Sequence, residues 1–342
     1  MSVQPVNNTM ESHEKKTSAV QEKDLQQQST MPITGVAKLV PVSWVPYVQL
    51  MRLNQPGILG ALMPLLQGLT YGVSVHPGAP MAAGVFIREV AYWTVVATFI
   101  QGAACTWNDI LDQDFDRRVP RTRSRPIARR AVSTRQAVVF MLAQLGVVVW
   151  LLEGGGFLPA ACRPYCVAMG VLHTLYPLTK RVMDFTPVFL GLPFCAMLLI
   201  AAVSQGAEVV GSTPVAALAM TELLWTVIYE TMYAHLDAPY DVQAGVRSMA
   251  VRYRHSFKSI ALVLGLLMVA AMALVGVLHR LSMLYFLVGC GGSALCLTLI
   301  LISVDLTSPA SIQYWFAVGF RLMGICRSGA FFVEYLLRLL SS

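Results

Sequence analysis

Oxygen-bearing side chains recur at intervals of one helical turn in residues 108–126, which read NDILDQDFDRRVPRTRSRP. Asn108, Asp112 and Asp116 are spaced i, i+4 and i+8, so on an α-helix they share one face. A charge at the mouth of an apolar helix costs roughly 2.5–3.5 kcal/mol if it is left in hydrocarbon, so these groups need a compensating partner. Hard oxygen ligands suit Mg²⁺, which takes one or two protein carboxylates together with water and substrate phosphates. The stretch therefore predicts a magnesium and phosphate site.

A second acidic group lies in residues 225–248, which read WTVIYETMYAHLDAPYDVQAGVRS. Glu230, Asp237 and Asp241 are spaced i, i+7 and i+11, which is again one helical face. Pro239 interrupts this pattern, because its ring clashes with the carbonyl group four residues earlier. The regular helix is therefore predicted to stop near residue 236, and a new turn is predicted to begin at residue 237 or 238.

Basic residues accompany these acidic stretches and are candidates for contact with phosphate oxygens, which guanidinium groups bind well. The candidates are Arg117, Arg121, Arg125, Lys180 and Arg247. The simpler alternative for each is an ordinary charge in a cytoplasmic loop.

The composition indicates a membrane protein. The 342 residues are 56% hydrophobic and only 13% charged, which is too apolar for an ordinary soluble domain. A helix needs about 20 apolar residues to cross a bilayer, and such runs predict an all-α integral membrane protein with about nine transmembrane helices. The predicted spans are residues 53–75, 82–107, 136–152, 159–178, 185–204, 214–236, 258–278, 281–303 and 312–337.

The net charge of +7 does not indicate a nucleic-acid partner, because the basic residues do not lie on one soluble face. They gather in alternate loops, at residues 117–135, 180–181 and 247–258, whereas the intervening loops have almost none. By the positive-inside rule the basic loops face the cytoplasm. This orientation places both acidic stretches on the same side of the membrane, as a shared site requires.

Residues 1–40 are polar and are predicted to form a disordered tail ahead of a single domain at residues 41–342. No apolar run precedes a cleavage site, so no secretory signal is predicted. The tail has no arginine and contains several acidic residues, which is unlike a mitochondrial presequence. We therefore expect insertion into the endoplasmic reticulum. The seven cysteines are scattered, and we expect them to be small apolar residues rather than disulfide partners or zinc ligands.

Two acidic clusters that open to one side of an apolar bundle, with cations beside them, match the requirements of an allylic diphosphate. Mg²⁺ neutralises the diphosphate and stabilises the departing pyrophosphate, and basic side chains add positive charge where negative charge develops. An apolar chamber keeps the remaining carbocation from water and admits a long isoprenoid tail. An electron-rich acceptor then attacks C1.

With these residues the chain resembles the UbiA superfamily of intramembrane prenyltransferases, whose motifs are NDxxDxxxD followed by DRxVxRTxxRP, and YDTxYAxxDxxxDxxxGxxS. The first motif is matched from Asn108 to Pro126, and the second from Tyr229 to Ser248. The family's YPxxKR loop appears at residues 176–181, and its MRLxxPxG entry at residues 51–57. The resemblance covers residues 47–253 and implies nine helices around a central cavity.

The resemblance also implies roles for single residues in a Mg²⁺-dependent reaction. One Mg²⁺ would be held by Asn108, Asp112 and Asp116, and the second by Asp237 and Asp241. Support for these ligands is expected from Asp109, Glu230 and Tyr233. The residue that accepts the acceptor's proton is not identifiable from the sequence.

Departures from the family's patterns bear on the acceptor more than on the reaction. Glu230 replaces the usual Asp, residues 54–55 read Asn-Gln where Asp-Lys is common, and Gln243 stands where Lys is common. With the polar tail, these changes resemble the fungal meroterpenoid prenyltransferases, which attach a farnesyl group to a polyketide-derived phenol or pyrone. The expected partners are therefore a prenyl diphosphate, an aromatic acceptor and the lipid bilayer.

Three other functions fit parts of the pattern. A 4-hydroxybenzoate polyprenyltransferase of ubiquinone biosynthesis and a UbiA-type terpene cyclase would share the fold. An ion-coupled transporter would also bury carboxylates, but it would not need matching arginine loops that open to one side. Arg52 is either an interfacial charge or part of the cavity mouth. Arg321, Arg327 and Glu334 either pair with one another, face the bundle interior or mark a helix at the surface.

Overall fold

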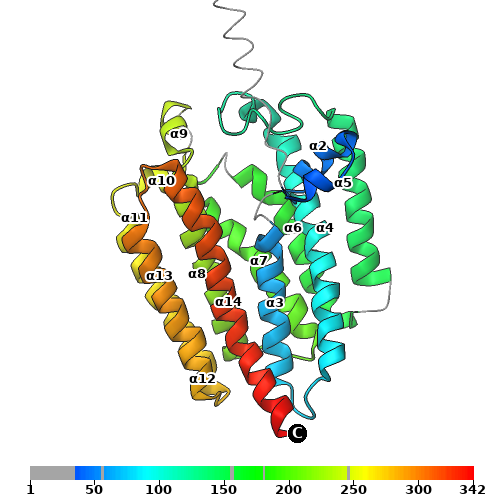
Figure 1. Ribbon diagram of the computed structural model, residues 1–342, viewed down its shortest axis with the longest axis vertical. Helices are drawn as coiled ribbons and strands as arrows, with labels where there is room; N and C mark the ends of the chain where they lie inside the picture. Colours follow the sequence, from blue (N-terminus) through cyan, green and yellow to red (C-terminus); the bar gives the residue numbers. More distant parts are fainter. Residues whose placement is uncertain (1–34, 55–57, 155–157, 180–181, 245–246) are drawn as a thin grey trace, which may run out of the picture.

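Helices form the regular secondary structure of residues 35–54, 58–154, 158–179, 182–244 and 247–342, which are the residues that the computed structural model describes (Figure 1). The α-helices are α2 (Val45–Leu50), α3 (Ile58–Val75), α4 (Ala83–Asp116), α5 (Thr134–Val149), α6 (Arg163–Thr179), α7 (Thr186–Ser204), α8 (Thr213–Ala234), α9 (Ala238–Ala244), α10 (Met249–Arg252), α11 (Phe257–Leu278), α12 (Met283–Tyr285), α13 (Gly292–Ser303) and α14 (Pro309–Ser341). Short 3-10 or π-helical segments are η1 (Gly35–Leu39), η2 (Val42–Trp44), η3 (Trp150–Gly154), η4 (Ala160–Cys162) and η5 (Phe286–Gly291). The predicted all-α class is confirmed.

Long apolar helices run side by side along the molecule (Figure 1). In the described part of the chain, seven helical segments are long and apolar enough to cross a membrane. They are Ala83–Asp116, Thr134–Gly154, Thr186–Ser204, Thr213–Ala234, Phe257–Leu278, Met283–Ser303 and Pro309–Ser341. The helices α3 and α6, with 18 and 17 residues, pack in the same bundle. These two and the seven correspond to the nine predicted spans, and the chain is a multi-pass membrane protein.

The helix that carries the first acidic stretch is longer than the sequence predicted. α4 has 34 residues and ends at Asp116, whereas the predicted span ended at residue 107. At 1.5 Å per residue the helix is about 51 Å long, so it exceeds the roughly 30 Å hydrocarbon layer of a bilayer. Its last turns therefore carry the acidic side chains on a continuous helix to the end of the bundle.

The predicted break in the second acidic stretch is confirmed. α8 ends at Ala234 and α9 begins at Ala238, so Pro239 lies in the first turn of α9, where its missing N–H group is not needed. The N–H of Asp241 donates to the carbonyl oxygen of Asp237 at 2.9 Å. The two aspartates therefore lie one helical turn apart.

Regular structure begins a few residues before the predicted domain boundary at residue 40. Residues 35–39 form η1, and Ala37 packs with Val45 and Val48 of α2. Residues 1–34 lie outside the described residues, so the disorder of the tail stays a prediction.

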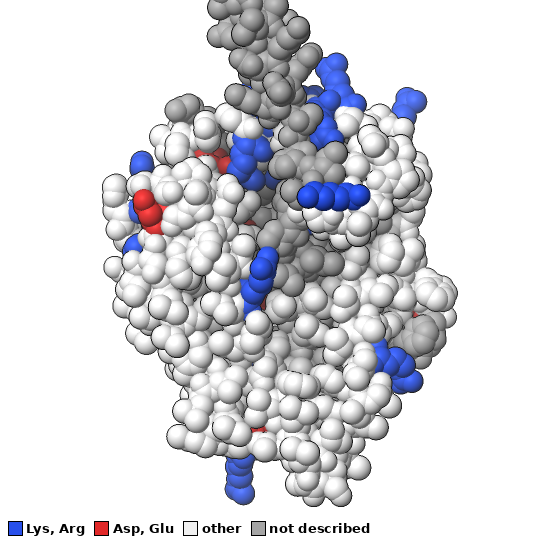
Figure 2. All heavy atoms as spheres, viewed as in Figure 1, with Lys and Arg blue, Asp and Glu red and all other residues white. Residues whose placement is uncertain are grey.

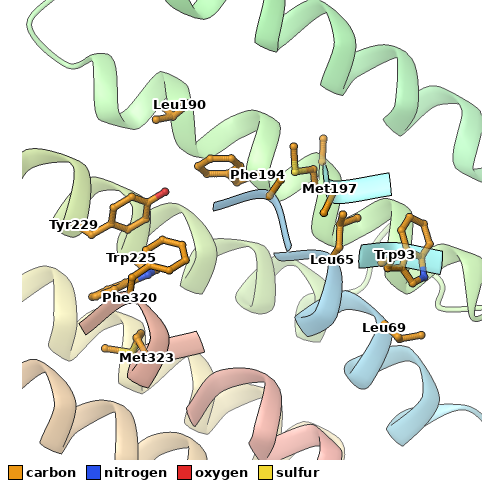
Figure 3. Packing of buried hydrophobic residues seen from close by; sticks show 14 of the residues in the cluster. Leu65, Leu69, Trp93, Leu190, Phe194, Met197, Trp225, Tyr229, Phe320 and Met323 are labelled. Carbon is orange, nitrogen blue, oxygen red and sulfur yellow. The ribbon is translucent and has the colours of Figure 1, made fainter. Parts of the chain in front are cut away.

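The space between the long helices is filled by apolar side chains. Figure 3 shows residues of α3, α7, α8 and α14 that point into one shared core, among them Leu65, Phe194, Tyr229 and Phe320. A Cβ atom at Gly68 of α3 would overlap the backbone of α7, so these two helices approach each other very closely. Such close approach at small residues is typical of helix packing in membranes.

Basic side chains gather at one end of the bundle. Figure 2 shows them mostly near the end that carries α2, α9 and α10, above a largely uncharged surface. The loops at this end contact one another, since Arg121 pairs with Asp237 and Arg252 Nη1 lies 2.7 Å from Asp184 Oδ2. The acidic stretches therefore lie on the same side as these basic loops, as the sequence predicted.

Candidate active site

The first acidic stretch occupies the last turns of α4. Asp112 and Asp116 are both buried, with exposed fractions of 8% and 6%, and Asn108 is half-buried one turn earlier. Because the helix continues without a break to Asp116, the predicted i, i+4, i+8 spacing places these side chains along one face. The structure therefore presents them as a column at the end of the bundle.

Asp109 faces a different set of partners. Its Oδ1 accepts from Arg52 Nη2 at 2.6 Å and lies 3.2 Å from Arg125 Nη1, and its side chain is 0% exposed. Arg52 lies in the turn after α2 with a φ of 60°, a left-handed conformation that costs about 1–3 kcal/mol for a residue with a side chain. The ion pair is one of the contacts that hold this turn. Asp109 therefore ties the turn after α2 to α4 and to the loop beyond α4.

Arg125 joins the buried aspartate to the end of the acidic column. Its Nη1 lies 3.0 and 2.9 Å from Asp116 Oδ1 and Oδ2, in addition to its contact with Asp109. Thr122 Oγ1 donates to the carbonyl oxygen of Asp116 at 3.1 Å, which folds the loop back over the helix end. Burial opposes the charged form of Arg125, but the carboxylates of Asp109 and Asp116 outweigh it and raise its pKa above the ordinary value. Arg125 is therefore a permanent cation in the site.

Arg121 connects the two acidic stretches directly. Its Nε donates to Asp237 Oδ1 at 2.8 Å and its Nη2 donates to Asp237 Oδ2 at 2.6 Å, which is the two-pronged geometry of a strong arginine–carboxylate pair. Its guanidinium carbon also lies 5.5 Å from the centre of the Tyr233 ring, a cation–π distance. Burial opposes its charge, but these partners raise the pKa of Arg121. The residues of both stretches thus form one site.

The second acidic stretch continues along α9. Asp241 is half-buried, and its Oδ2 accepts from Ser248 Oγ at 3.4 Å. Ser248 Oγ also accepts from Val251 N at 3.3 Å and caps α10. Glu230, which we expected to support the ligands, is half-buried near the end of α8. The structure therefore gathers α8, α9 and α10 around the predicted aspartates.

Only part of the predicted set of cations contacts these carboxylates. Within the described ranges, Arg121 and Arg125 contact aspartates of the two motifs. Arg117 turns instead to its own helix end, where its Nη1 lies 2.7 Å from Asp114 Oδ1. Arg247 is exposed, and Lys180 lies outside the described residues. The structure therefore brings Arg121 and Arg125, but not Arg117, against the predicted carboxylates, and contact of any of them with a diphosphate stays a prediction.

Residues of α2 contribute to the site, and the sequence did not single them out. Gln49 is buried, its backbone oxygen accepts from Arg52 Nη1 at 3.0 Å, and its Oε1 accepts from Arg129 Nη2 at 2.8 Å. The sequence allowed Arg52 to be either an interfacial charge or part of the cavity mouth. In the structure it is buried against Asp109. The available signal was weak: Gln49 is a polar residue in the short helix that ends just before Arg52.

The donor set fits Mg²⁺ that is shared with a phosphate ligand. Among the residues that the structure describes, no three His, Cys, Asp or Glu side chains are close enough to enclose a metal ion. Mg²⁺ usually takes only one or two carboxylates and leaves its other positions to water and phosphate. Asp112 with Asp116, and Asp237 with Asp241, each supply two carboxylates separated by one turn. In addition, Asp109 Oδ2 is buried and has no hydrogen-bond partner in the described structure.

The sequence of the chain is similar to those of known proteins. A family model for the UbiA prenyltransferase family matches residues 61–325. The chain is 34% identical over 290 residues to the prenyltransferase ascA of Acremonium egyptiacum, across 83% of this chain and 81% of that protein. It is 32% identical over 304 residues to the mitochondrial 4-hydroxybenzoate polyprenyltransferase of Saccharomyces cerevisiae, across 88% of this chain and 79% of that protein.

The fold is similar to that of a UbiA homolog from Archaeoglobus fulgidus, whose structure contains bound GPP and Mg²⁺. The TM-score is 0.63, and the similarity covers 84% of this chain and 99% of that chain at 16% sequence identity. At this level of identity the similarity shows a common fold.

Proposed function

Because the chain belongs to the UbiA prenyltransferase family and is therefore an enzyme that transfers prenyl groups, we propose that it transfers a farnesyl group from farnesyl diphosphate to a polyketide-derived phenol or pyrone in a Mg²⁺-dependent reaction. The observation that carries this proposal is the fork of Arg121 on Asp237, at 2.8 and 2.6 Å. It joins the two acidic stretches at one end of an apolar bundle, where a diphosphate can meet both stretches while its isoprenoid tail enters the bundle.

We assign two roles to the carboxylates of the site: some would bind Mg²⁺, and one positions an arginine. Asp112 and Asp116, with Asn108, would hold one Mg²⁺, and Asp237 and Asp241 would hold a second. When bound, Mg²⁺ neutralises the diphosphate and stabilises the pyrophosphate that departs. Asp109 supports these ligands rather than binding Mg²⁺ directly, because Arg52 and Arg125 share its Oδ1. It positions Arg125, and its unpartnered Oδ2 would accept from a Mg²⁺-bound water.

The arginines would bind and orient the diphosphate. Arg121 and Arg125 present N–H groups beside Asp237 and Asp116, so a phosphate oxygen placed between the two acidic stretches can accept from both. Guanidinium groups suit this task because they offer paired donors and stay charged in a partly buried site. Positive charge held there stabilises the transition state, in which negative charge grows on the leaving oxygen.

The reaction exchanges one bond for another. The bond between C1 of the prenyl group and the diphosphate oxygen breaks, and its electron pair leaves with pyrophosphate. A carbon or oxygen of the electron-rich acceptor supplies the pair that bonds to C1, and the acceptor then loses a proton to solvent. Apolar side chains of α3, α7, α8 and α14 line the interior (Figure 3) and keep water away from the carbocation-like C1.

A second candidate is prenylation of 4-hydroxybenzoate with a longer polyprenyl chain. The similarity to the Saccharomyces cerevisiae enzyme favours it, since 79% of that protein is covered. Departures from the family pattern at residues 54–55 and at Glu230 and Gln243 favour the phenol or pyrone acceptor. We further propose that the basic loops face the cytoplasm, as the positive-inside rule favours.

The proposal is tested with purified protein in detergent. Farnesyl and geranylgeranyl diphosphates are each offered with Mg²⁺ and a panel of phenolic acids, pyrones and 4-hydroxybenzoate. Pyrophosphate release and product mass are measured. We expect Mg²⁺-dependent release that requires an acceptor, with a product heavier than the acceptor by one farnesyl group. Products without any acceptor would indicate a terpene cyclase, and no release with either diphosphate would show that the proposed donor is wrong.

The proposed magnesium ligands are tested with single substitutions and one control at a neighbouring aspartate of α4. Asp112→Ala and Asp237→Ala are expected to lower turnover by about a thousandfold or more, since they remove charge that stabilises the transition state. Asp114→Ala is the matched control, because Asp114 is 76% exposed and pairs with Arg117 outside the site. Near-normal turnover in Asp112→Ala or Asp237→Ala would show that the assignment is wrong.

A further inference from the structure

Three polar side chains meet deep inside the apolar bundle. Arg327 of α14 places its Nη2 against Glu222 Oε2 of α8 and Gln67 Oε1 of α3, and Gln67 Nε2 lies 3.3 Å from Thr221 Oγ1. The exposed fractions of Gln67, Glu222 and Arg327 are 1%, 3% and 2%. Charges in a bilayer interior are costly and usually serve a function. The sequence had left Arg327 unassigned, and its partner is neither Arg321 nor Glu334.

Helix register gives the depth of this polar network below the active site. Tyr233 of α8 contacts Phe316 of α14 with ring centres 4.2 Å apart, directly beneath Arg121. Eleven residues separate Tyr233 from Glu222 on α8, and eleven separate Phe316 from Arg327 on α14. At 1.5 Å per residue the two contacts are therefore about 17 Å apart along both helices.

Aromatic and apolar side chains fill the wall between these two levels. Tyr229 and Trp225 of α8 have ring centres 5.5 Å apart, and Tyr229 lies 4.8 Å from Phe320 of α14. Figure 3 shows these rings facing Phe194 and Leu65 across the core. An isoprenoid chain that leaves the diphosphate site along this wall meets apolar surface until it reaches the network.

The network lies where the chain could otherwise continue. One turn from Arg327, a Cβ atom at Gly324 would overlap the side chain of Met63 of α3, so α3 and α14 approach each other closely beside the network. Beyond the network, at the far end of the bundle, a cavity of about 1150 Å³ opens beside Val73, Tyr165 and Val203. Val73 lies six residues beyond Gln67 on α3, so this cavity begins about 9 Å further from the active site than the network does.

From this placement we infer that Glu222, Arg327 and Gln67 form a polar floor that sets the length of the prenyl chain. The inference rests on the proposed prenyl transfer. A C–C bond of about 1.5 Å advances an extended chain by about 1.3 Å, so a farnesyl group reaches about 14 Å and a geranylgeranyl group about 19 Å. If C1 of the prenyl group lies at the level of Tyr233, about 17 Å separates it from the floor. A farnesyl group fits within that length, and a geranylgeranyl group does not. A longer chain would have to press its apolar end against a buried ion pair, which has no favourable interaction to offer.

The test measures binding and so needs no acceptor. Geranyl, farnesyl and geranylgeranyl thiolodiphosphates, whose C1–S bond resists cleavage, are titrated with Mg²⁺ against the full-length protein in detergent. Affinity is expected to rise from the geranyl to the farnesyl analogue and to fall by about tenfold or more for the geranylgeranyl analogue. Equal or tighter binding of the geranylgeranyl analogue by the unaltered protein would overturn the floor. If none of the three analogues binds, both the proposed prenyl transfer and the inferred floor are refuted.

A variant tests the residues themselves. Glu222→Leu combined with Arg327→Leu removes both charges together, so no buried charge is left alone. The preference for farnesyl over geranylgeranyl is expected to fall by about tenfold or to reverse. Gln144→Leu is the matched control, because it removes another buried polar side chain, at 2% exposed, between α4 and α5. The control should keep the preference of the unaltered protein. A double variant that binds farnesyl normally and keeps the same preference would also overturn the inference.

Discussion

Replacing Asp109 by Asn is expected to destabilise the protein strongly. The substitution keeps the shape of the side chain but removes the charge that Arg52 Nη2 contacts at 2.6 Å and Arg125 Nη1 at 3.2 Å. The side chains of Asp109, Arg52 and Arg125 are 0%, 11% and 16% exposed. Two guanidinium groups would therefore lose a shared carboxylate in a region that water reaches poorly.

The size of the effect follows from burial. Removing one partner of a buried ion pair costs about 3–5 kcal/mol, and we expect the lower end, about 3 kcal/mol, because Arg125 keeps Asp116. Asp114→Asn is the matched control. Asp114 lies on the same helix and pairs with Arg117 at 2.7 Å, but it is 76% exposed, and such surface pairs contribute only about 0–1 kcal/mol.

Both variants are unfolded in the same detergent, and the loss of helical circular dichroism is followed during a denaturant titration. The free energy of unfolding should fall by about 3 kcal/mol for Asp109→Asn and by less than about 1 kcal/mol for Asp114→Asn. Adding Arg52→Gln to Asp109→Asn should recover part of the loss, because one unmatched cation is removed. Equal stability of the two single variants would refute the conclusion that Asp109 holds the site together.

Three further predictions concern the ion pairs and their surroundings. Arg121→Lys keeps the charge but loses the fork on Asp237, so kcat/KM should fall by about tenfold or more at nearly unchanged stability; an unchanged kcat/KM would contradict a role for the fork. Burial lowers the pKa of His235 below its ordinary 6.5, so the stability that it contributes is present above pH 6.5 and is lost as the pH falls toward its folded pKa. His235→Gln should then lose less thermal stability than the unaltered protein on acidification, and parallel curves would contradict this. Chelation of divalent metal should abolish turnover with little change in the thermal midpoint, because Arg121 and Arg125 already neutralise carboxylates of the site; a large drop in the midpoint would show that the metal is structural.

The elements of the site could be predicted because they depend on short-range rules. Three oxygen-bearing side chains at one-turn spacing indicated a helix, and α4 indeed continues to Asp116. Pro239 indicated a helix break because of its ring and its missing N–H group, and α8 and α9 separate there. The alternation of basic loops indicated that both acidic stretches share one end, and the contact of Arg121 with Asp237 agrees.

The partners could not be predicted, because they depend on how distant helices align. Arg52 and Asp109 are 57 residues apart, and Glu222 and Arg327 are 105 residues apart. A shift of one residue along either helix would separate such a pair, and no local pattern fixes that alignment. The direction of Arg117 has a different cause: its N–H still donates to Gln113 O at 3.3 Å, as in a helix, and its side chain pairs with Asp114 three residues earlier, on a face away from the acidic column.

The ion pairs at the mouth of the bundle also explain how the carboxylates persist before substrate binds. A buried carboxylate is costly unless it is paired and hydrogen-bonded, and Arg125 and Arg121 meet that need for Asp116 and Asp237. A diphosphate that enters with a divalent cation brings both signs of charge. In the proposed reaction each guanidinium would then turn from carboxylate to phosphate, since the carboxylate that it leaves would still be faced by the divalent cation. Arginine suits both states because its planar fork matches carboxylate and phosphate alike, so the contacts that stabilise the ligand-free site can also be those that recognise the substrate.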